Sequence, residues 1–130
     1  MPSPINLDVG IDSHDTPSIA IFVFLFVVTT PVSEEILYRG LLVAWLRRVG
    51  WSDSAILLVG SLIFGANHFI PLGFVWSAAM VALGAILYAL RLRYDSLAPA
   101  WLAHVLFNAQ PILLYPLIAW LAPAVLPGRL

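Results

Sequence analysis

Residues 18–48 read SIAIFVFLFVVTTPVSEEILYRGLLVAWLRR, an apolar stretch that lies between an acidic N-terminal segment and a pair of arginines. About 18 predominantly apolar residues are enough for a helix to cross the hydrocarbon core of a bilayer. We therefore expect one long helix over 18–48, which Pro31 can kink because proline lacks the N–H of an internal helical turn. A cleavable signal sequence would begin with basic residues, and this segment has none before residue 18.

The composition of the whole chain places it in a membrane. Of its 130 residues, 62% are hydrophobic and 10% are charged, and the mean hydropathy is +0.97. A soluble domain carries about 25% charged residues. We expect an all-α, polytopic membrane helix bundle, with a polar N-terminal segment over 1–17 and the helical domain over 18–130. The net charge of -1 argues against nucleic acid as a partner, and the absence of cysteine excludes disulfides and thiolate catalysis.

A second apolar stretch predicts a helix that follows the arginine pair. Asp53 or Ser54 would cap this helix at its start, and the apolar pattern continues to about Phe69. Pro71 and Gly73 then predict a tight turn.

Two further stretches complete the bundle. The third helix is expected over 74–90, and the fourth begins at Leu97. Pro111 and Pro116 either kink this fourth helix or divide it from a short terminal one. The chain is therefore expected to have about four to five transmembrane helices.

The arginines predict an orientation in the membrane. Arg47 and Arg48 follow the first span, Arg91 and Arg93 follow the third, and the connections on the other side carry no Arg or Lys. Because basic residues concentrate in cytoplasmic loops, the N-terminus is expected outside the cytoplasm. Basic residues that are all arginine are typical of a GC-rich bacterial genome, so we expect the bacterial cytoplasmic (inner) membrane.

Three polar motifs interrupt the apolar helices. They are EEILYR at 34–39, FGANH at 64–68 and HVLFN at 104–108. With a rise of about 1.5 Å per helical residue, Glu34, His68 and Asn108 lie at similar depths on three different helices. Ionisable groups are costly in hydrocarbon, so side chains kept at one depth predict a functional site.

The residue types in these motifs suit hydrolysis of a carbonyl compound. Glu34 is expected to act as the general base, and His68 is expected to bind and polarise the attacking water. His104 and Asn108, four residues apart on one helical face, are expected to donate hydrogen bonds to the oxyanion. The set is complete for cleavage of a peptide bond.

A supporting pair is expected beside this set. Glu35 and Arg39 are four residues apart on one helix and can pair as carboxylate and guanidinium. Glu34 is turned by about 100° from Glu35, so the two carboxylates can point to different places.

The three motifs together resemble the CPBP family of intramembrane proteases. That family includes the type II CAAX prenyl endopeptidases and bacteriocin-processing or immunity proteins. The resemblance covers about residues 33–110, with Glu-Glu-x-x-x-Arg, Phe-x-x-x-His and His-x-x-x-Asn in order. It implies a glutamic peptidase without an obligatory metal or other cofactor, in which Glu34 and His68 activate water and the oxyanion residues fall on His104 and Asn108.

The chain departs from this family before the Glu-Glu motif, where members usually carry additional membrane helices and this sequence has half a span. We expect either a minimal member or one that completes its bundle as a homo-oligomer. The expected partners are the lipid bilayer and a membrane-associated peptide or protein substrate.

Two other mechanisms fit some of the same residues. Glu34, His68 and His104 could bind zinc with one position open for water, although no His-Glu-x-x-His motif supports such a site. Ser33 could be a nucleophile, but it lacks a Gly-x-Ser-x-Gly setting and is better explained as a capping residue.

Two other classes of function also remain open. A non-catalytic membrane protein could bind a peptide or a bacteriocin and confer immunity by sequestering it. A transporter could use the buried Glu and His residues to relay protons, although the sequence shows no internal repeat. Replacing Glu34 by glutamine separates the peptide-binding protein from the hydrolase, because the hydrolase needs the carboxylate as a base and the binding protein does not.

Overall fold

The structure is a computed structural model that describes residues 16–125. Every element in this range is helical, so the all-α prediction is confirmed for it. The first helix runs unbroken over Thr16–Arg48, as expected, and we call it the N-terminal helix. Its segments are α1 (Thr16–Phe24), η1 (Leu25–Thr29), α2 (Thr30–Glu34), η2 (Glu35–Leu42) and α3 (Val43–Arg48). Of the expected polar segment 1–17, residues 1–15 lie outside the described range.

The η1 and η2 segments are π-helical, and they flank Pro31. Proline has no N–H for the backbone ladder, and a π-turn accommodates such an interruption without ending the helix. The carbonyl of Phe26 in η1 instead accepts a hydrogen bond from Asn108 Nδ2 at 3.0 Å. π-turns are frequent at functional sites. Here they widen the N-terminal helix just before Pro31 and across the Glu35–Arg39 turn.

Helix α4 spans Asp53–Asn67. Its N-cap is Ser52, whose Oγ accepts a hydrogen bond from the Ala55 N–H at 3.3 Å, so the predicted caps at the two following residues were wrong. Ser52 has extended backbone angles, which a capping residue requires, whereas Asp53 is already helical. The helix ends two residues before the expected Phe69, because a bend at His68 separates it from the next helix.

Helix α5 spans Phe69–Tyr94 and is longer at both ends than the expected 74–90. The expected turn at Pro71 and Gly73 is a break of one residue, where Gly73 has φ 76° and ψ 179°. Only glycine adopts these angles without strain. Helix α6 then spans Ala98–Val125 without interruption, so its prolines do not divide it.

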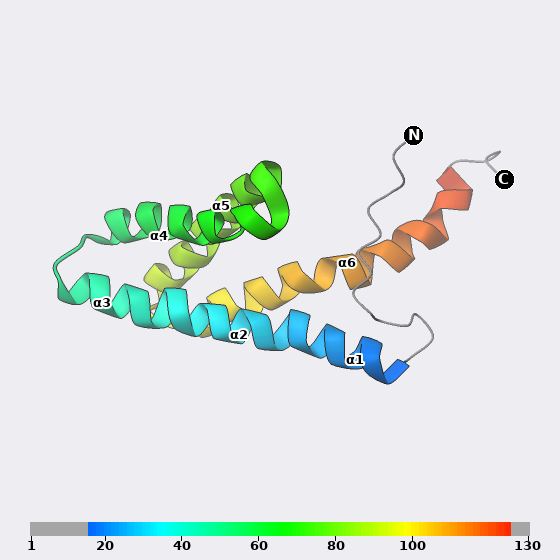
Figure 1. The fold of residues 1–130 in the computed structure, drawn as a ribbon, viewed down its shortest axis with the longest axis horizontal. Helices are drawn as coiled ribbons and strands as arrows, with labels where there is room; N and C mark the ends of the chain where they lie inside the picture. The colour runs from blue at the N-terminus through cyan, green and yellow to red at the C-terminus, as the bar shows by residue number, and fades with distance from the viewer. Residues whose placement is uncertain (1–15, 126–130) are drawn as a thin grey trace.

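Figure 1 shows how these four helices pack. The N-terminal helix and α6 lie side by side near the middle of the bundle and separate toward the ends of α1 and α6. Helices α4 and α5 form a closely packed pair. Glycine permits this approach, since a Cβ on Gly65 would lie 2.9 Å from the backbone of α5 and one on Gly84 would lie 3.2 Å from Ser61 Cα.

An ion-pair cluster closes the end of the bundle where α3 finishes. Arg47 bonds Asp53 at 3.1 Å and Asp95 at 2.8 Å, and Arg91 bonds Asp95 at 2.7 Å. The hydrogen bond from Arg91, followed by that from Arg47, holds the pKa of Asp95 below its ordinary value. The cluster joins the ends of the N-terminal helix, α4 and α5.

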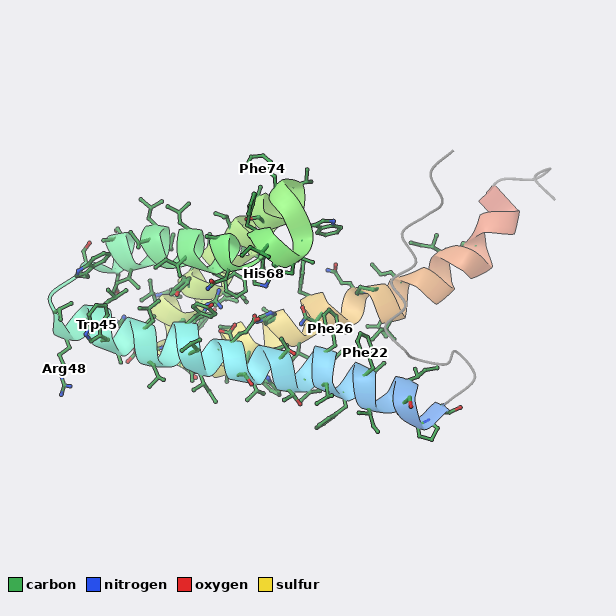
Figure 2. The ribbon with its side chains drawn as sticks, viewed as in Figure 1. Phe22, Phe26, Trp45, Arg48, His68 and Phe74 are labelled. Carbon is green, nitrogen blue, oxygen red and sulfur yellow. The ribbon has the colours of Figure 1, made fainter. Side chains whose placement is uncertain are left out.

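The outer surface of the bundle is strongly apolar. Large hydrophobic side chains are exposed on every helix, and Ile70 reaches 94% exposure beside Phe74 and Val75. Figure 2 shows this dense outer layer of apolar side chains along the helices. Two described helices, Thr16–Arg48 and Phe69–Tyr94, are long and apolar enough to cross a membrane. Such a surface is suited to contact with lipid.

Candidate active site

A cavity of about 340 Å³ lies between the N-terminal helix, the end of α4, α5 and α6. It is lined by Phe26, Thr30, Glu34, His68, Leu72, Trp76, Met80, His104, Phe107, Asn108, Gln110 and Pro111. All four residues that the sequence predicted as catalytic line this one cavity. The expectation that the three motifs meet at one depth is therefore confirmed by their positions.

Glu34 and His68 face each other across the cavity. The distance from Glu34 Oε1 to His68 Nε2 is 4.0 Å, which is too long for a direct hydrogen bond. His68 Nδ1 lies 2.8 Å from the Phe64 carbonyl oxygen. A carbonyl only accepts, so Nδ1 carries the proton and the Nε2 of a neutral ring presents a lone pair to the cavity. Both side chains are partly exposed, at 24% for Glu34 and 21% for His68.

The ring of Phe64 positions His68 further. The two ring centroids are 4.8 Å apart, as their spacing of one helical turn predicted. Figure 2 shows His68 at the bend between α4 and α5. The bend ends the regular helix at this residue, so its imidazole can reach toward the N-terminal helix.

His104 connects the two glutamates of the first motif. Its Nδ1 lies 2.8 Å from Glu35 Oε1, and its Nε2 lies 3.5 Å from Glu34 Oε2. When Glu35 is ionised, Nδ1 must donate, which fixes the ring orientation and directs Nε2 toward Glu34. The sequence predicted His104 for the oxyanion and did not predict that it bridges the glutamates.

Asn108 follows His104 by one turn and lies 9% exposed at the cavity wall. Its Nδ2 donates to the carbonyl oxygen of Phe26. An amide nitrogen carries two protons, so one N–H of Asn108 is used by this bond and the other is available. The bond also ties α6 to the π-helical segment η1.

Glu35 and Arg39 form the ion pair that their spacing predicted. Arg39 Nη1 lies 3.2 Å from Glu35 Oε1, and both residues are almost fully buried. Arg39 Nη2 also donates to the Gly84 carbonyl at 3.4 Å. The guanidinium lies 4.3 Å from the ring centroid of Phe64 and 4.5 Å from that of Tyr88, within the range of cation–π attraction.

Several contributors to this region were missed in the sequence. Tyr88 is fully buried and its hydroxyl donates to the Tyr38 carbonyl at 3.3 Å, and Arg91 Nε donates to the Arg39 carbonyl at 3.0 Å. Both acceptors lie in η2, where the π-turns change the backbone ladder. Tyr88 sits in an apolar stretch with no motif around it, so only its contacts reveal its role.

The described residues contain no group of three His, Asp or Glu side chains arranged to hold a metal ion. The zinc alternative at Glu34, His68 and His104 is therefore left to experiment. The Glu34 carboxylate and the imidazoles of His68 and His104 converge on the cavity. This arrangement suits activation of a water molecule.

A comparison with families of known proteins identifies a related family. The family described as type II CAAX prenyl endopeptidase Rce1-like matches residues 16–110, which is well over half of the chain. No curated protein and no solved structure matches. The chain therefore belongs to this family of CAAX-type proteases, as the three motifs predicted, and with its two candidate spans it is an integral membrane protein.

Proposed function

We propose that this member of the Rce1-like family is an intramembrane endopeptidase of the glutamic type. It hydrolyses a peptide bond near the membrane-held end of a peptide or protein tail. The observation that carries the proposal is the 4.0 Å separation of Glu34 Oε1 and His68 Nε2 inside a cavity of about 340 Å³. The family assignment supports a peptidase, and the geometry supports this particular chemistry.

A single water fits the separation of Glu34 and His68. A water about 2.8 Å from both atoms would subtend an angle of roughly 90°, close to that between its own two O–H bonds. It would donate one proton to Glu34 and the other to His68 Nε2, which leaves its lone pairs free to attack a carbonyl carbon. Glu34 takes the proton as the C–O bond forms.

The oxyanion of the tetrahedral intermediate would be bound by His104 and Asn108. Asn108 offers the N–H that Phe26 does not use. His104 offers Nε2–H when both ring nitrogens carry a proton, since its Nδ1 already faces Glu35 Oε1. Glu34 then returns its proton to the leaving amine when the C–N bond breaks.

Glu35 and Arg39 act through His104 in this proposal. Glu35 holds the imidazole by its bond to Nδ1, and Arg39 offsets the charge of the buried carboxylate. Both are positioning residues, since neither lines the cavity in which the water and the substrate would meet.

The wall of the cavity indicates an apolar substrate. It combines Phe26, Leu72, Trp76, Met80 and Phe107 with the polar set. A peptide with large apolar side chains near the cleaved bond would lose water from those side chains as it binds. We propose the bacterial cytoplasmic membrane as its location, with the N-terminus outside the cytoplasm, and no metal as a cofactor.

The test is cleavage of a quenched fluorescent library of membrane peptides by the purified chain. Glu34→Gln should lower the cleavage rate by about 100-fold or more, since general bases contribute factors of this size. Arg48→Gln is the matched control, because it also removes one charge but lies exposed at the far end of the N-terminal helix (Figure 2). It should cleave like the wild type.

The same preparations distinguish a peptidase from a binding protein. If the wild type cleaves no peptide while it and Glu34→Gln bind labelled peptides equally well, the non-catalytic or immunity function is correct instead. Equal cleavage by the wild type and Glu34→Gln would refute Glu34 as the base.

A further inference from the structure

A hydrogen bond outside the catalytic cavity joins the N-terminal helix to the end of α4. Asn67 Nδ2 donates to the hydroxyl oxygen of Tyr38. Neither residue lines the catalytic cavity, and both line a separate groove with Leu37, Leu41 and Trp45. The proposed peptidase mechanism assigns no role to either residue.

This hydrogen bond lies next to the expected water site in the sequence of both helices. Tyr38 follows Glu34 by four residues, which is about one helical turn, and Asn67 directly precedes His68. The ring of Tyr38 also meets the ring of Phe64 edge-on, with centroids 5.4 Å apart, and Phe64 is the residue that contacts His68. Tyr38 therefore contacts α4 at two residues that position His68.

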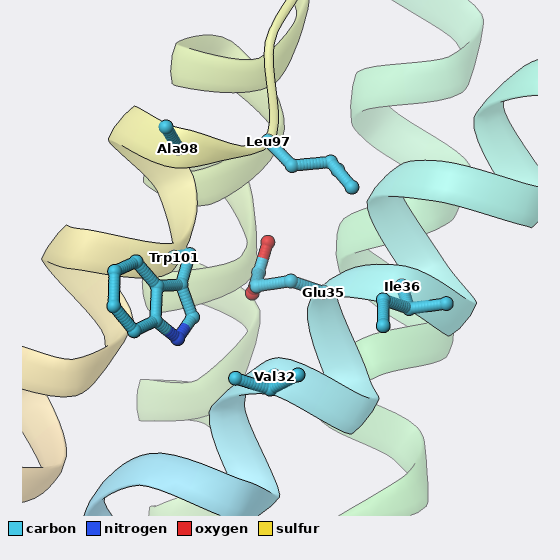
Figure 3. Close-up of a pocket in the computed structure, with 6 residues that line it drawn as sticks. All are labelled: Val32, Glu35, Ile36, Leu97, Ala98 and Trp101. Atoms are coloured by element: carbon cyan, nitrogen blue, oxygen red, sulfur yellow. The ribbon is translucent and has the colours of Figure 1, made fainter.

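The N-terminal helix, which carries Glu34, is held on another flank by α6. Figure 3 shows the carboxyl group of Glu35 between Leu97 and Trp101 of α6. Glu35 Oε1 lies 2.8 Å from His104 Nδ1 of the same helix. These contacts fix the N-terminal helix relative to α6, and they do not involve α4.

The end of α4, which leads to His68, is held by α5 instead. Ser77 Oγ of α5 donates to the carbonyl oxygen of Gly65 at 2.7 Å. The same carbonyl accepts from the His68 N–H at 3.0 Å, so the bend at His68 is fixed to α5. Glu34 and His68 are thus held by different helices, and the distance between them depends on contacts that cross from one side to the other.

The hydrogen bond from Asn67 is well placed among those crossing contacts. Arg47 and Asp53 join the same two helices at the opposite end of α4, about 21 Å away at 1.5 Å per residue. Two side chains of α5 donate to backbone carbonyls of η2. The bond from Asn67 is made one residue from His68, so its loss would be felt first at the distance between Glu34 and His68.

That distance matters because a single water has to bridge it. Two hydrogen bonds of about 2.8 Å meet at roughly 90° when Glu34 Oε1 and His68 Nε2 are 4.0 Å apart. They would meet at roughly 160° if the two atoms were about 5.5 Å apart, far from the angle between the two O–H bonds of water. A modest opening between the helices would therefore misplace the nucleophile.

We propose that Tyr38 and Asn67 are positioning residues that set the width of the water site between Glu34 and His68. This inference rests on the proposed function and deepens it. Loss of the hydrogen bond lets the N-terminal helix move away from the end of α4, and the bridging water is then held less well. The apolar wall that would bind the substrate contains neither residue, so the turnover step is affected and substrate binding is not.

The kinetic test compares Tyr38→Phe, Asn67→Leu and the double variant, with the best peptide of the fluorescent library as substrate. Tyr38→Phe keeps the ring on Phe64 and removes only the hydroxyl group. Each single variant should lower kcat by roughly tenfold or more with KM within about twofold, because small misplacements of reacting groups are costly. The double variant should lose no more than either single variant, since all three lack the same hydrogen bond.

Ser61→Ala is the matched control. It also removes one hydrogen bond of α4, from Ser61 Oγ to the Leu57 carbonyl, but that bond lies within the helix. Its kcat should equal that of the wild type. If kcat instead falls in proportion to the free energy of unfolding across all variants, Ser61→Ala included, the Tyr38–Asn67 bond only stabilises the fold and the proposal is wrong.

A second readout needs no cleavage. The chain has no cysteine, so spin labels can be placed at Leu37→Cys and Ala66→Cys, two exposed positions beside the pair. Adding Tyr38→Phe should shift the distance between the labels to larger values and broaden its distribution, while adding Ser61→Ala should not. An unchanged distance would overturn the proposal even if Asn67→Leu failed to fold. A wild type that cleaves nothing while the distance still depends on Tyr38 would refute the proposed function and leave the spacing role supported.

Discussion

Replacing Arg39 by methionine should destabilise this protein far more than the loss of one surface charge would. Arg39 is 0% exposed and pairs with Glu35 at 3.2 Å, and its guanidinium lies near the rings of Phe64 and Tyr88. Methionine fills a similar volume but leaves the buried Glu35 carboxylate with only His104 as a partner. Removal of one member of a buried ion pair costs about 3–5 kcal/mol of the free energy of unfolding.

The double variant separates pairing from packing. Glu35→Gln alone leaves the Arg39 guanidinium buried without its carboxylate and should cost a similar amount, again about 3–5 kcal/mol. Glu35→Gln combined with Arg39→Met removes both charges and should cost about 2 kcal/mol or less, because a neutral pair needs no compensation. The two single effects should therefore exceed the double effect by several kcal/mol.

The free energy of unfolding can be measured by titrating SDS into mild detergent micelles and following the helical circular dichroism signal. Arg48→Met serves as the control, since that arginine is exposed and its replacement should change the free energy by about 0.5 kcal/mol or less. If Arg39→Met lies within about 1 kcal/mol of the wild type, or if the double variant loses the sum of the single variants, the pair does not compensate a buried charge.

Three further predictions concern packing, pH and metal. Gly65→Ala should lower the free energy of unfolding by about 1–3 kcal/mol, because its Cβ would lie 2.9 Å from backbone atoms of α5. Gly40→Ala is the control and should have little effect, because its Cβ would meet nothing closer than 3.7 Å. Equal losses for the two variants in the SDS titration would contradict this prediction. Asp95→Asn should lower the thermal unfolding midpoint at neutral pH. Arg91 and Arg47 depress the pKa of Asp95 in the folded protein, so the extra stability of the wild type is present above the ordinary pKa of about 4. That extra stability disappears as the pH falls through the pKa of Asp95 in the folded protein. Asparagine also tolerates the left-handed backbone at this position, so a difference that persists at low pH would point to the backbone instead. EDTA should leave peptide cleavage unchanged, and elemental analysis should find less than one zinc per chain; activity lost to EDTA and restored by zinc would establish a metal mechanism.

The candidate site could be predicted well from the sequence because its residues are spaced by helical turns. Glu35 and Arg39 pair as their i, i+4 spacing predicts, and the ring of His68 lies against that of Phe64, tilted by 55°, for the same reason. The boundaries were less predictable. Ser52 caps α4 because its backbone is extended. Asp53 and Ser54 have equally suitable side chains, but both already lie within the helix.

The sequence by itself determined that this is an all-helical membrane protein, that its polar motifs share one depth, and which family it resembles. These properties follow from apolar length and from helical periodicity, both of which are local. The tertiary structure decided that His104 joins Glu34 to Glu35 and that Asn108 bonds the carbonyl of Phe26. Those contacts depend on how the helices are rotated against one another, and that rotation results from the packing of glycine, Tyr88 and the buried arginine between helices far apart in the chain.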